Sequence, residues 1–149
     1  MVDRVGTHKL QIERRLAASP DRVFDAWLDA ERLRAFMCPG DIRHSEVELD
    51  ARVGGQFRIV MHGDQGRYQH TGEFREIQRP SRLVFTWRSE ATQHCTTLVT
   101  LELGADGSDG CRLLLTQKLL PDPEAVQKHT LGWNSILDKL VIDLRLLPQ

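Results

Sequence analysis

The hydrophobic pattern changes its period once along the chain, and this change constrains the fold more than any other feature. From residue 43 to about 118, apolar and polar residues alternate, which is typical of β-strands. After Pro121-Asp122-Pro123-Glu124, a helix start with Asp122 as its cap, apolar residues recur at steps of three and four as far as Leu147. Strands followed by one long amphipathic helix predict a curved sheet that buries one face against that helix.

The rest of the chain fits the same architecture. Residues 8–16 alternate like a strand, and two short helices follow, with Ser19-Pro20-Asp21 at the start of the first and Asp29 as the cap of the second. Short connections join the later strands, so the sheet should be largely antiparallel. The expected strands of this part cover residues 45–50, 56–62, 68–77, 83–89, 96–103 and 112–119. We predict one α+β domain over residues 1–149.

Composition excludes several classes of protein. A chain of 149 residues can bury about 69% of its surface and needs no disulfide or metal for stability. Its 20 Lys and Arg against 21 Asp and Glu argue against a nucleic acid or an anionic membrane as partner. With no apolar run near the ~18 residues of a membrane span and no secretion signal, we expect a cytoplasmic protein. Three cysteines without CxxC spacing are expected to be small buried hydrophobes: Cys38, Cys95 and Cys111.

Several strings resemble one known family. They are ELDARVGG at 48–55, QFRIVM at 56–61, GEFREI at 72–77, LVFTW at 83–87 after Pro80, and Gly132-Trp133. Together they resemble the activator-of-heat-shock-protein-90-ATPase-like family of the START-like (SRPBCC) superfamily, over residues 12–147. The resemblance implies a helix-grip fold, with a deep cavity between sheet and C-terminal helix that family members use for apolar ligands. It implies no shared catalytic machinery.

The alternation of the strands predicts which side chains face this cavity. Gln117 lies among leucines, and Tyr68 and His70 share a face, so these polar groups either orient a ligand or are satisfied by neighbouring side chains or buried water. We therefore predict a ligand-binding site made of apolar, aromatic and polar side chains: Phe57, Ile59, Met61, Tyr68, His70, Phe85, Trp87, Gln117, Trp133 and Leu137.

Motifs for metal, phosphate or nucleophile chemistry are not found in the sequence. Six histidines lack HxH or HxxxH spacing, so surface positions are expected for them: His8, His44, His62, His70, His94 and His129. The glycines at 104, 107 and 110 fit a hairpin loop rather than a phosphate loop, and no GxSxG elbow occurs. We expect no metal, no cofactor and no catalytic residue.

Three functions remain open from the sequence. The first is a binding module that holds a small apolar or amphipathic molecule in the cavity. The second is a chaperone-interacting module, although nothing resembles the second domain of the co-chaperone that gives the family its name. The third is an enzyme of the cyclase or dehydratase type, for which His70 is the only candidate acid or base. The sequence leaves open whether the protein is a homodimer.

Overall fold

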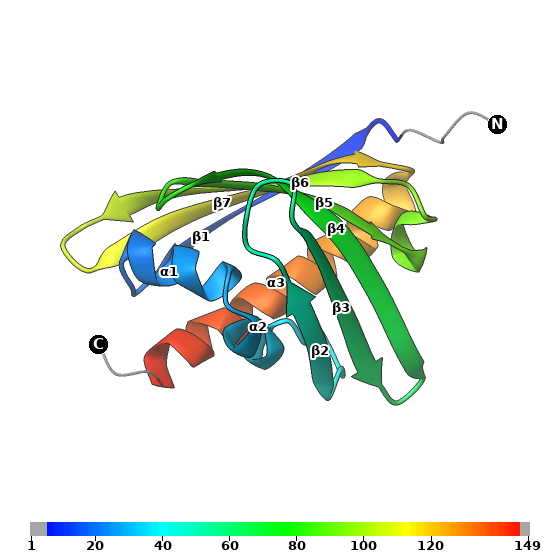
Figure 1. Cartoon of the computed structure of the whole chain (residues 1–149), viewed down its shortest axis with the longest axis horizontal. Helices are drawn as coiled ribbons and strands as arrows, with labels where there is room; N and C mark the ends of the chain where they lie inside the picture. Colours follow the sequence, from blue (N-terminus) through cyan, green and yellow to red (C-terminus); the bar gives the residue numbers. More distant parts are fainter. Residues whose placement is uncertain (1–5, 147–149) are drawn as a thin grey trace.

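A seven-stranded antiparallel sheet curves over one long helix (Figure 1). The computed structural model describes residues 6–146, so Leu147 of the predicted helix stripe lies outside the described residues. The strands are β1 (His8–Leu16), β2 (His44–Leu49), β3 (Gln56–Gly63), β4 (Gly66–Gln78), β5 (Arg82–Ser89), β6 (Thr97–Asp106) and β7 (Gly110–Leu120). The helices are α1 (Pro20–Trp27), α2 (Ala30–Phe36), the 3-10 helix η1 (Glu90–Thr92) and α3 (Pro123–Leu146). The strand order β1-β7-β6-β5-β4-β3-β2 confirms the predicted helix-grip architecture.

The predicted caps fix where the helices begin. Ser19 accepts a hydrogen bond from the Arg22 amide at 3.3 Å, and Asp29 accepts from the Glu31 amide at 2.9 Å. At the start of α3, Asp122 accepts from the Ala125 amide at 2.8 Å. Each cap satisfies an amide that has no partner inside its own helix, so the local sequence determines these boundaries.

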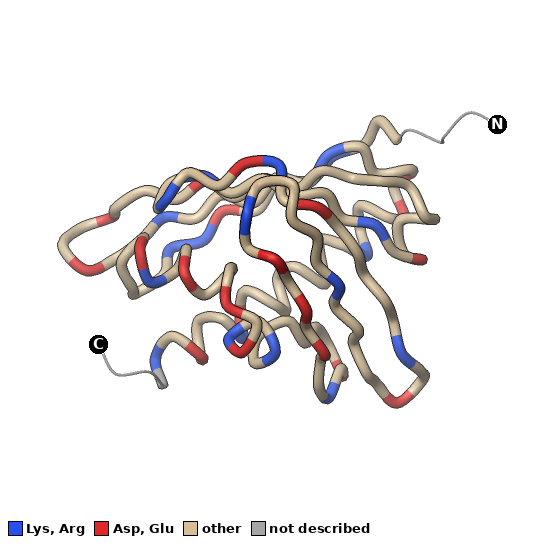
Figure 2. Tube along the Cα trace, in the orientation of Figure 1, with Lys and Arg blue, Asp and Glu red and all other residues tan. Residues whose placement is uncertain are grey.

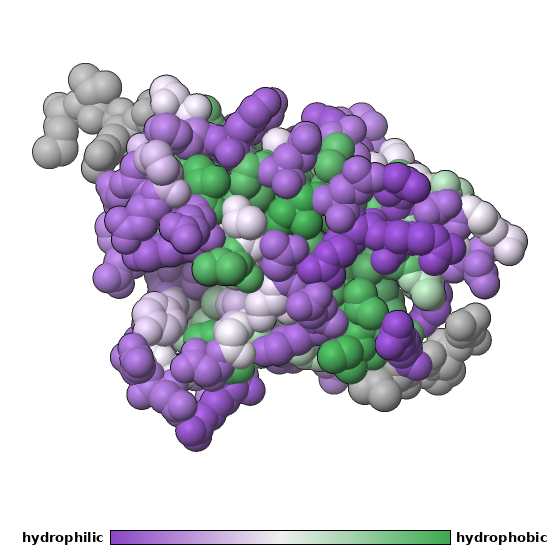
Figure 3. All heavy atoms as spheres, turned by 180° about the vertical axis from the view of Figure 1, so that it is seen from behind, coloured by the Kyte–Doolittle hydropathy of each residue, from purple (hydrophilic) through white to green (hydrophobic). Residues whose placement is uncertain are grey.

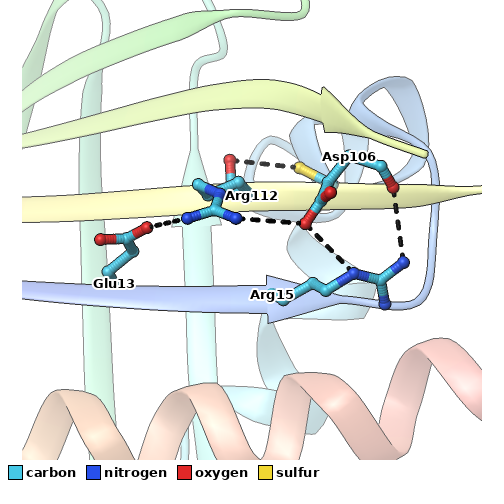
Figure 4. Close-up of polar contacts among 5 residues, drawn as sticks. Glu13, Arg15, Asp106 and Arg112 are labelled. Atoms are coloured by element: carbon cyan, nitrogen blue, oxygen red, sulfur yellow. Dashed lines mark hydrogen bonds and ion pairs between the residues drawn. The ribbon is translucent and has the colours of Figure 1, made fainter.

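Residues of both charges are interspersed along the described part of the chain (Figure 2). At one end of the sheet they connect three strands: Arg112 of β7 lies 2.6 Å from Glu13 of β1 and 3.5 Å from Asp106 of β6, and Arg15 of β1 contacts the same Asp106 carboxylate at 3.1 Å (Figure 4). Because these groups are largely open to water, each pair contributes little to the stability of the fold. Among the described residues, no helix has the length and apolar character required to cross a membrane.

Aromatic rings fill the centre of the molecule between the sheet and α3. Trp133 lies between two other tryptophans, with ring centroids 5.0 Å from Trp87 and 6.3 Å from Trp27. Three phenylalanine rings on β3, β4 and β5 pack against one another at centroid distances of 5.6 to 6.4 Å: Phe57, Phe74 and Phe85. Two of them also lie beside Trp87, Phe57 at 6.0 Å and Phe85 at 6.3 Å. The gap left among these groups is only about 20 Å³. The deep central cavity that the resemblance implied is therefore closed at this point, because each aromatic side chain occupies so much volume.

Candidate functional site

A pocket of about 270 Å³ opens at one end of the molecule, where the β3–β4 hairpin faces the first half of α3. Its walls come from β3, β4, β5, η1 and α3 and from the loop between α2 and β2. The residues that line it are Pro39, Ile42, Met61, Tyr68, Gln69, His70, Trp87, Ser89, Glu90, Ala91, Lys128, His129, Gly132, Trp133 and Ile136. Most of this lining is carbon, so the pocket suits an apolar molecule with few polar groups.

Two tryptophans in contact with each other, with ring centroids 5.0 Å apart, form adjoining parts of the wall, and buried hydrogen bonds hold the Trp133 indole and the Trp87 backbone. The Trp133 indole Nε1–H donates to Gln117 Oε1 at 2.8 Å, and Gln117 Nε2 donates to Thr97 Oγ1 at 2.9 Å. Thr97 Oγ1 donates in turn to the carbonyl oxygen of Trp87 at 2.6 Å. Gln117 and Thr97 are fully buried. This chain of hydrogen bonds joins α3, β7, β6 and β5 and connects the Trp133 indole to the backbone of Trp87.

The predicted site residues occupy three different places. Met61, Tyr68, His70, Trp87 and Trp133 line the pocket. Phe57, Ile59 and Phe85 surround the small central gap next to Trp87, and Leu137 is fully buried in the core. Gln117 is fully buried and does not line the pocket. Its amide bonds to the side chains of Trp133 and Thr97.

His70 is a buried imidazole with an unsatisfied nitrogen. It is 8% exposed, its ring centroid lies 4.8 Å from that of Trp87, and Nδ1 has no hydrogen-bond partner among residues 6–146. Burial lowers the pKa of His70 to about 4, and the nearby His129 acts in the same direction, although the backbone carbonyls of Ile59 and Tyr68 oppose the shift. His70 is therefore neutral at pH 7.

His129 is the second buried histidine of the pocket, where the sequence predicted a surface position. It is 8% exposed, and Nδ1 lies 2.7 Å from the backbone oxygen of Ala125, one turn earlier in α3. Burial lowers the pKa of His129, and the positive charge of Lys128 lowers it further. The prediction was wrong because it treated the histidines only as metal ligands. The helical spacing offered a signal: His129 precedes Trp133 by four residues, so both lie on the inner face of α3.

Other lining residues were also missed, Ser89 and Gly132 among them. Ser89 follows Phe85 and Trp87 at strand spacing, so strand alternation could have placed it on the inner face. Gly132 leaves open space beside α3: a Cβ added there would meet no atom within 4 Å. A glycine inside a helix costs about 0.5–1 kcal/mol relative to alanine, and here its effect is to widen the pocket.

The polar groups of the pocket do not form a familiar catalytic or metal-binding arrangement. Within residues 6–146, no group of three or more His, Cys, Asp or Glu side chains is arranged to hold a metal ion. The three cysteines are buried and unpaired, in agreement with their expected role as small hydrophobes. The arrangement offers apolar contact, two aromatic surfaces and two neutral imidazoles.

Comparison with known proteins agrees with this architecture. The protein from Chromobacterium violaceum has a solved structure with 26% identity and a TM-score of 0.78, over 90% of this chain and 94% of that one. The AHSA1 protein from Silicibacter pomeroyi shows 27% identity and a TM-score of 0.75, with 93% and 99% covered. An HSP90 activator from Plasmodium falciparum shows 25% identity and a TM-score of 0.76, with 92% and 96% covered.

The sequence comparisons give the family. No curated protein matches the chain significantly. The model of the family described as "Activator of Hsp90 ATPase homolog 1-like protein" matches residues 17–144, which include every strand except β1 and every helix except the last two residues of α3. This match confirms the resemblance seen in the sequence strings, and the chain belongs to the Activator of Hsp90 ATPase homolog 1-like family of START-like (SRPBCC) domains.

Proposed function

We propose that this domain binds a small, mainly apolar molecule in the pocket between the β3–β4 hairpin and α3. The observation that carries the proposal is an open, carbon-lined pocket with Trp87 and Trp133 in its wall. Both tryptophans are almost completely buried, and hydrogen bonds hold the Trp133 indole and the Trp87 backbone, so this part of the wall is already ordered before a ligand binds.

The volume limits the ligand. An apolar cavity of ~150 Å³ accepts benzene, whereas the pocket here measures about 270 Å³. Two or three fused rings, or a short branched chain, fit this space. A long acyl chain would have to pass through the centre, where the aromatic rings leave only about 20 Å³.

Filling the pocket from Gly132 tests the proposal. A Gly132→Leu side chain would project into the open space beside α3 without meeting another atom at its Cβ. We expect naphthalene to quench or shift the tryptophan fluorescence of the wild type and to have no effect on Gly132→Leu.

Gly104→Leu is the matched control. Gly104 lies on β6, outside the pocket, and a Cβ there also meets no atom within 4 Å. This variant should bind naphthalene like the wild type. Flat titrations of the wild type with naphthalene and other ring compounds of this size would contradict the proposal.

A second candidate is a module that acts on a chaperone ATPase. Family membership and the similarity to the Plasmodium falciparum HSP90 activator support it. The view from behind shows apolar atoms in separate patches among polar side chains (Figure 3). The exposed large hydrophobic residues are likewise scattered over different elements: Val53, Tyr68, Leu119, Leu131 and Ile142. Purified protein at micromolar concentration should stimulate the ATPase of a heat-shock-protein-90-type chaperone if this candidate is correct, and absence of stimulation would remove it.

A further inference from the structure

The polar atoms of the pocket specify more about the ligand than its size does. The backbone oxygen of Ala125 can only accept a hydrogen bond, so the Nδ1 of His129 at 2.7 Å must carry the proton. In the neutral imidazole the other nitrogen, Nε2, is then an acceptor. His129 therefore presents the pocket with an acceptor whose identity is fixed by its own helix.

The opposite wall contains two more polar atoms for which the described part of the chain supplies no hydrogen-bond partner. His70 of β4 and Ser89 of β5 are directly paired in the sheet register. The exposed fractions are 8% for His70 and 5% for Ser89, and within residues 6–146 neither His70 Nδ1 nor Ser89 Oγ makes a hydrogen bond. Buried polar atoms are nearly always satisfied, so water or a ligand group must supply the partner here.

We infer that the ligand is a planar, uncharged molecule of two or three rings that carries one hydrogen-bond donor, a hydroxyl or a ring N–H, and that this donor bonds to Nε2 of His129 while the rings lie against Trp87 and Trp133. This inference rests on the proposed function and adds the chemical class of the ligand. The His70 and Ser89 side of the pocket accommodates a second, weaker polar contact.

Charged ligands fit this site poorly. A carboxylate brings only acceptor atoms to the acceptor nitrogen of His129, and it would lose its hydration among carbon atoms. The cation at the rim, Lys128, already lies 3.2 Å from Glu124 one turn earlier. A cationic ligand would have to leave water for walls that are mostly apolar, with Glu90 as the only carboxylate among the lining residues. A neutral donor avoids both costs.

Two pairs of probes isolate the donor. 2-Naphthol and 2-methoxynaphthalene share the ring system, but only the first can donate a hydrogen bond; indole and 1-methylindole repeat the comparison with an N–H. At pH 7.5, isothermal titration calorimetry of the wild-type protein should give Kd values about 5- to 100-fold lower for the donor of each pair, since a buried hydrogen bond is gained.

Variants of His129 then locate the acceptor. His129→Leu should remove the preference for the donor within each pair, whereas His129→Gln, which keeps an acceptor oxygen, should retain part of it. His8→Leu changes an exposed histidine of β1 and should leave the preference intact. Thermal unfolding of each variant checks that the fold persists.

The possible outcomes separate this inference from the proposed function. Equal affinities within both pairs in the wild type would overturn the ligand class but leave a binding pocket. A preference that persists in His129→Leu would overturn the role of His129. If none of the four probes nor naphthalene binds, the proposed function fails as well.

Discussion

The hydrogen bond between Trp133 and Gln117 allows a quantitative test of the core beside the pocket. Replacing Gln117 by Leu keeps a side chain of similar size but leaves the buried Nε1–H of Trp133 without its acceptor at 2.8 Å. An unsatisfied buried donor costs about 1–3 kcal/mol, so Gln117→Leu should lower the free energy of unfolding by that amount. Thr97 loses the Gln117 donor but keeps its own bond to the Trp87 carbonyl.

A double-mutant cycle separates this bond from the other effects of each change. Trp133→Phe removes the donor and some ring volume, which should cost about 2–4 kcal/mol. In the Trp133→Phe background Gln117 no longer serves an indole, so the double variant should lose about 1–2 kcal/mol less than the sum of the single variants. Urea unfolding followed by circular dichroism measures all four proteins.

An exposed amide, that of Gln11, provides the control for this cycle. Gln11→Leu removes an exposed amide that donates to Thr116 Oγ1 at 3.2 Å, and should cost less than about 0.5 kcal/mol. If the effects of Gln117→Leu and Trp133→Phe add within about 0.5 kcal/mol, the buried bond does not couple α3 to the sheet and the reasoning is refuted.

Substitutions at three other residues, His70, Gly132 and Gly72, should each change the stability of the protein in a defined direction. The pKa of His70 is about 4 in the folded protein against an ordinary 6.5, so the contribution of neutral His70 to the free energy of unfolding is complete above pH 6.5 and is lost as the pH falls towards 4. Between pH 7.5 and 5, urea unfolding should show that the wild type loses about 2 kcal/mol more of this free energy than His70→Phe. Equal losses in the two proteins would contradict this. Gly132→Ala should stabilise the protein by about 0.5–1 kcal/mol in the same assay, and a loss would show that the space beside α3 is filled. Gly72→Ala should destabilise the protein by about 1–3 kcal/mol, because the added Cβ would lie 2.0 Å from the backbone oxygen of Thr86 and 2.3 Å from Phe57 Cζ. Unchanged stability would refute that clash.

The sequence predicted the elements of the fold because their causes are local. Ser19, Asp29 and Asp122 are recognisable as caps, and alternation identified the strands. Alternation also predicts on which face of the sheet a side chain lies, but it does not predict whether that side chain packs in the closed centre or borders the open pocket. Phe57 and Met61 share the inner face of β3, yet Phe57 lies beside the closed centre and Met61 lies in the open pocket.

The position of the pocket depends on contacts between distant parts of the chain. Trp27 comes from α1, a helix that strand patterns cannot place, and its ring lies 6.3 Å from that of Trp133. This tryptophan helps to close the middle of the space that a sheet over a single helix leaves. Open volume remains where the first half of α3 faces the hairpin, at a segment that carries Gly132 instead of a larger side chain.

Gln117 illustrates how a polar residue can serve a binding site without lining it. Its amide connects, through Thr97, the indole of Trp133 to the backbone of Trp87, so it ties the Trp133 side chain to the strand that carries Trp87. A wall that is already rigid loses little conformational entropy on binding, which favours affinity. Gln117→Leu should therefore weaken the binding of 2-naphthol although residue 117 lies outside the pocket, whereas Gln11→Leu should not. Equal Kd values for Gln117→Leu and the wild type would show that the chain of hydrogen bonds stabilises the core alone.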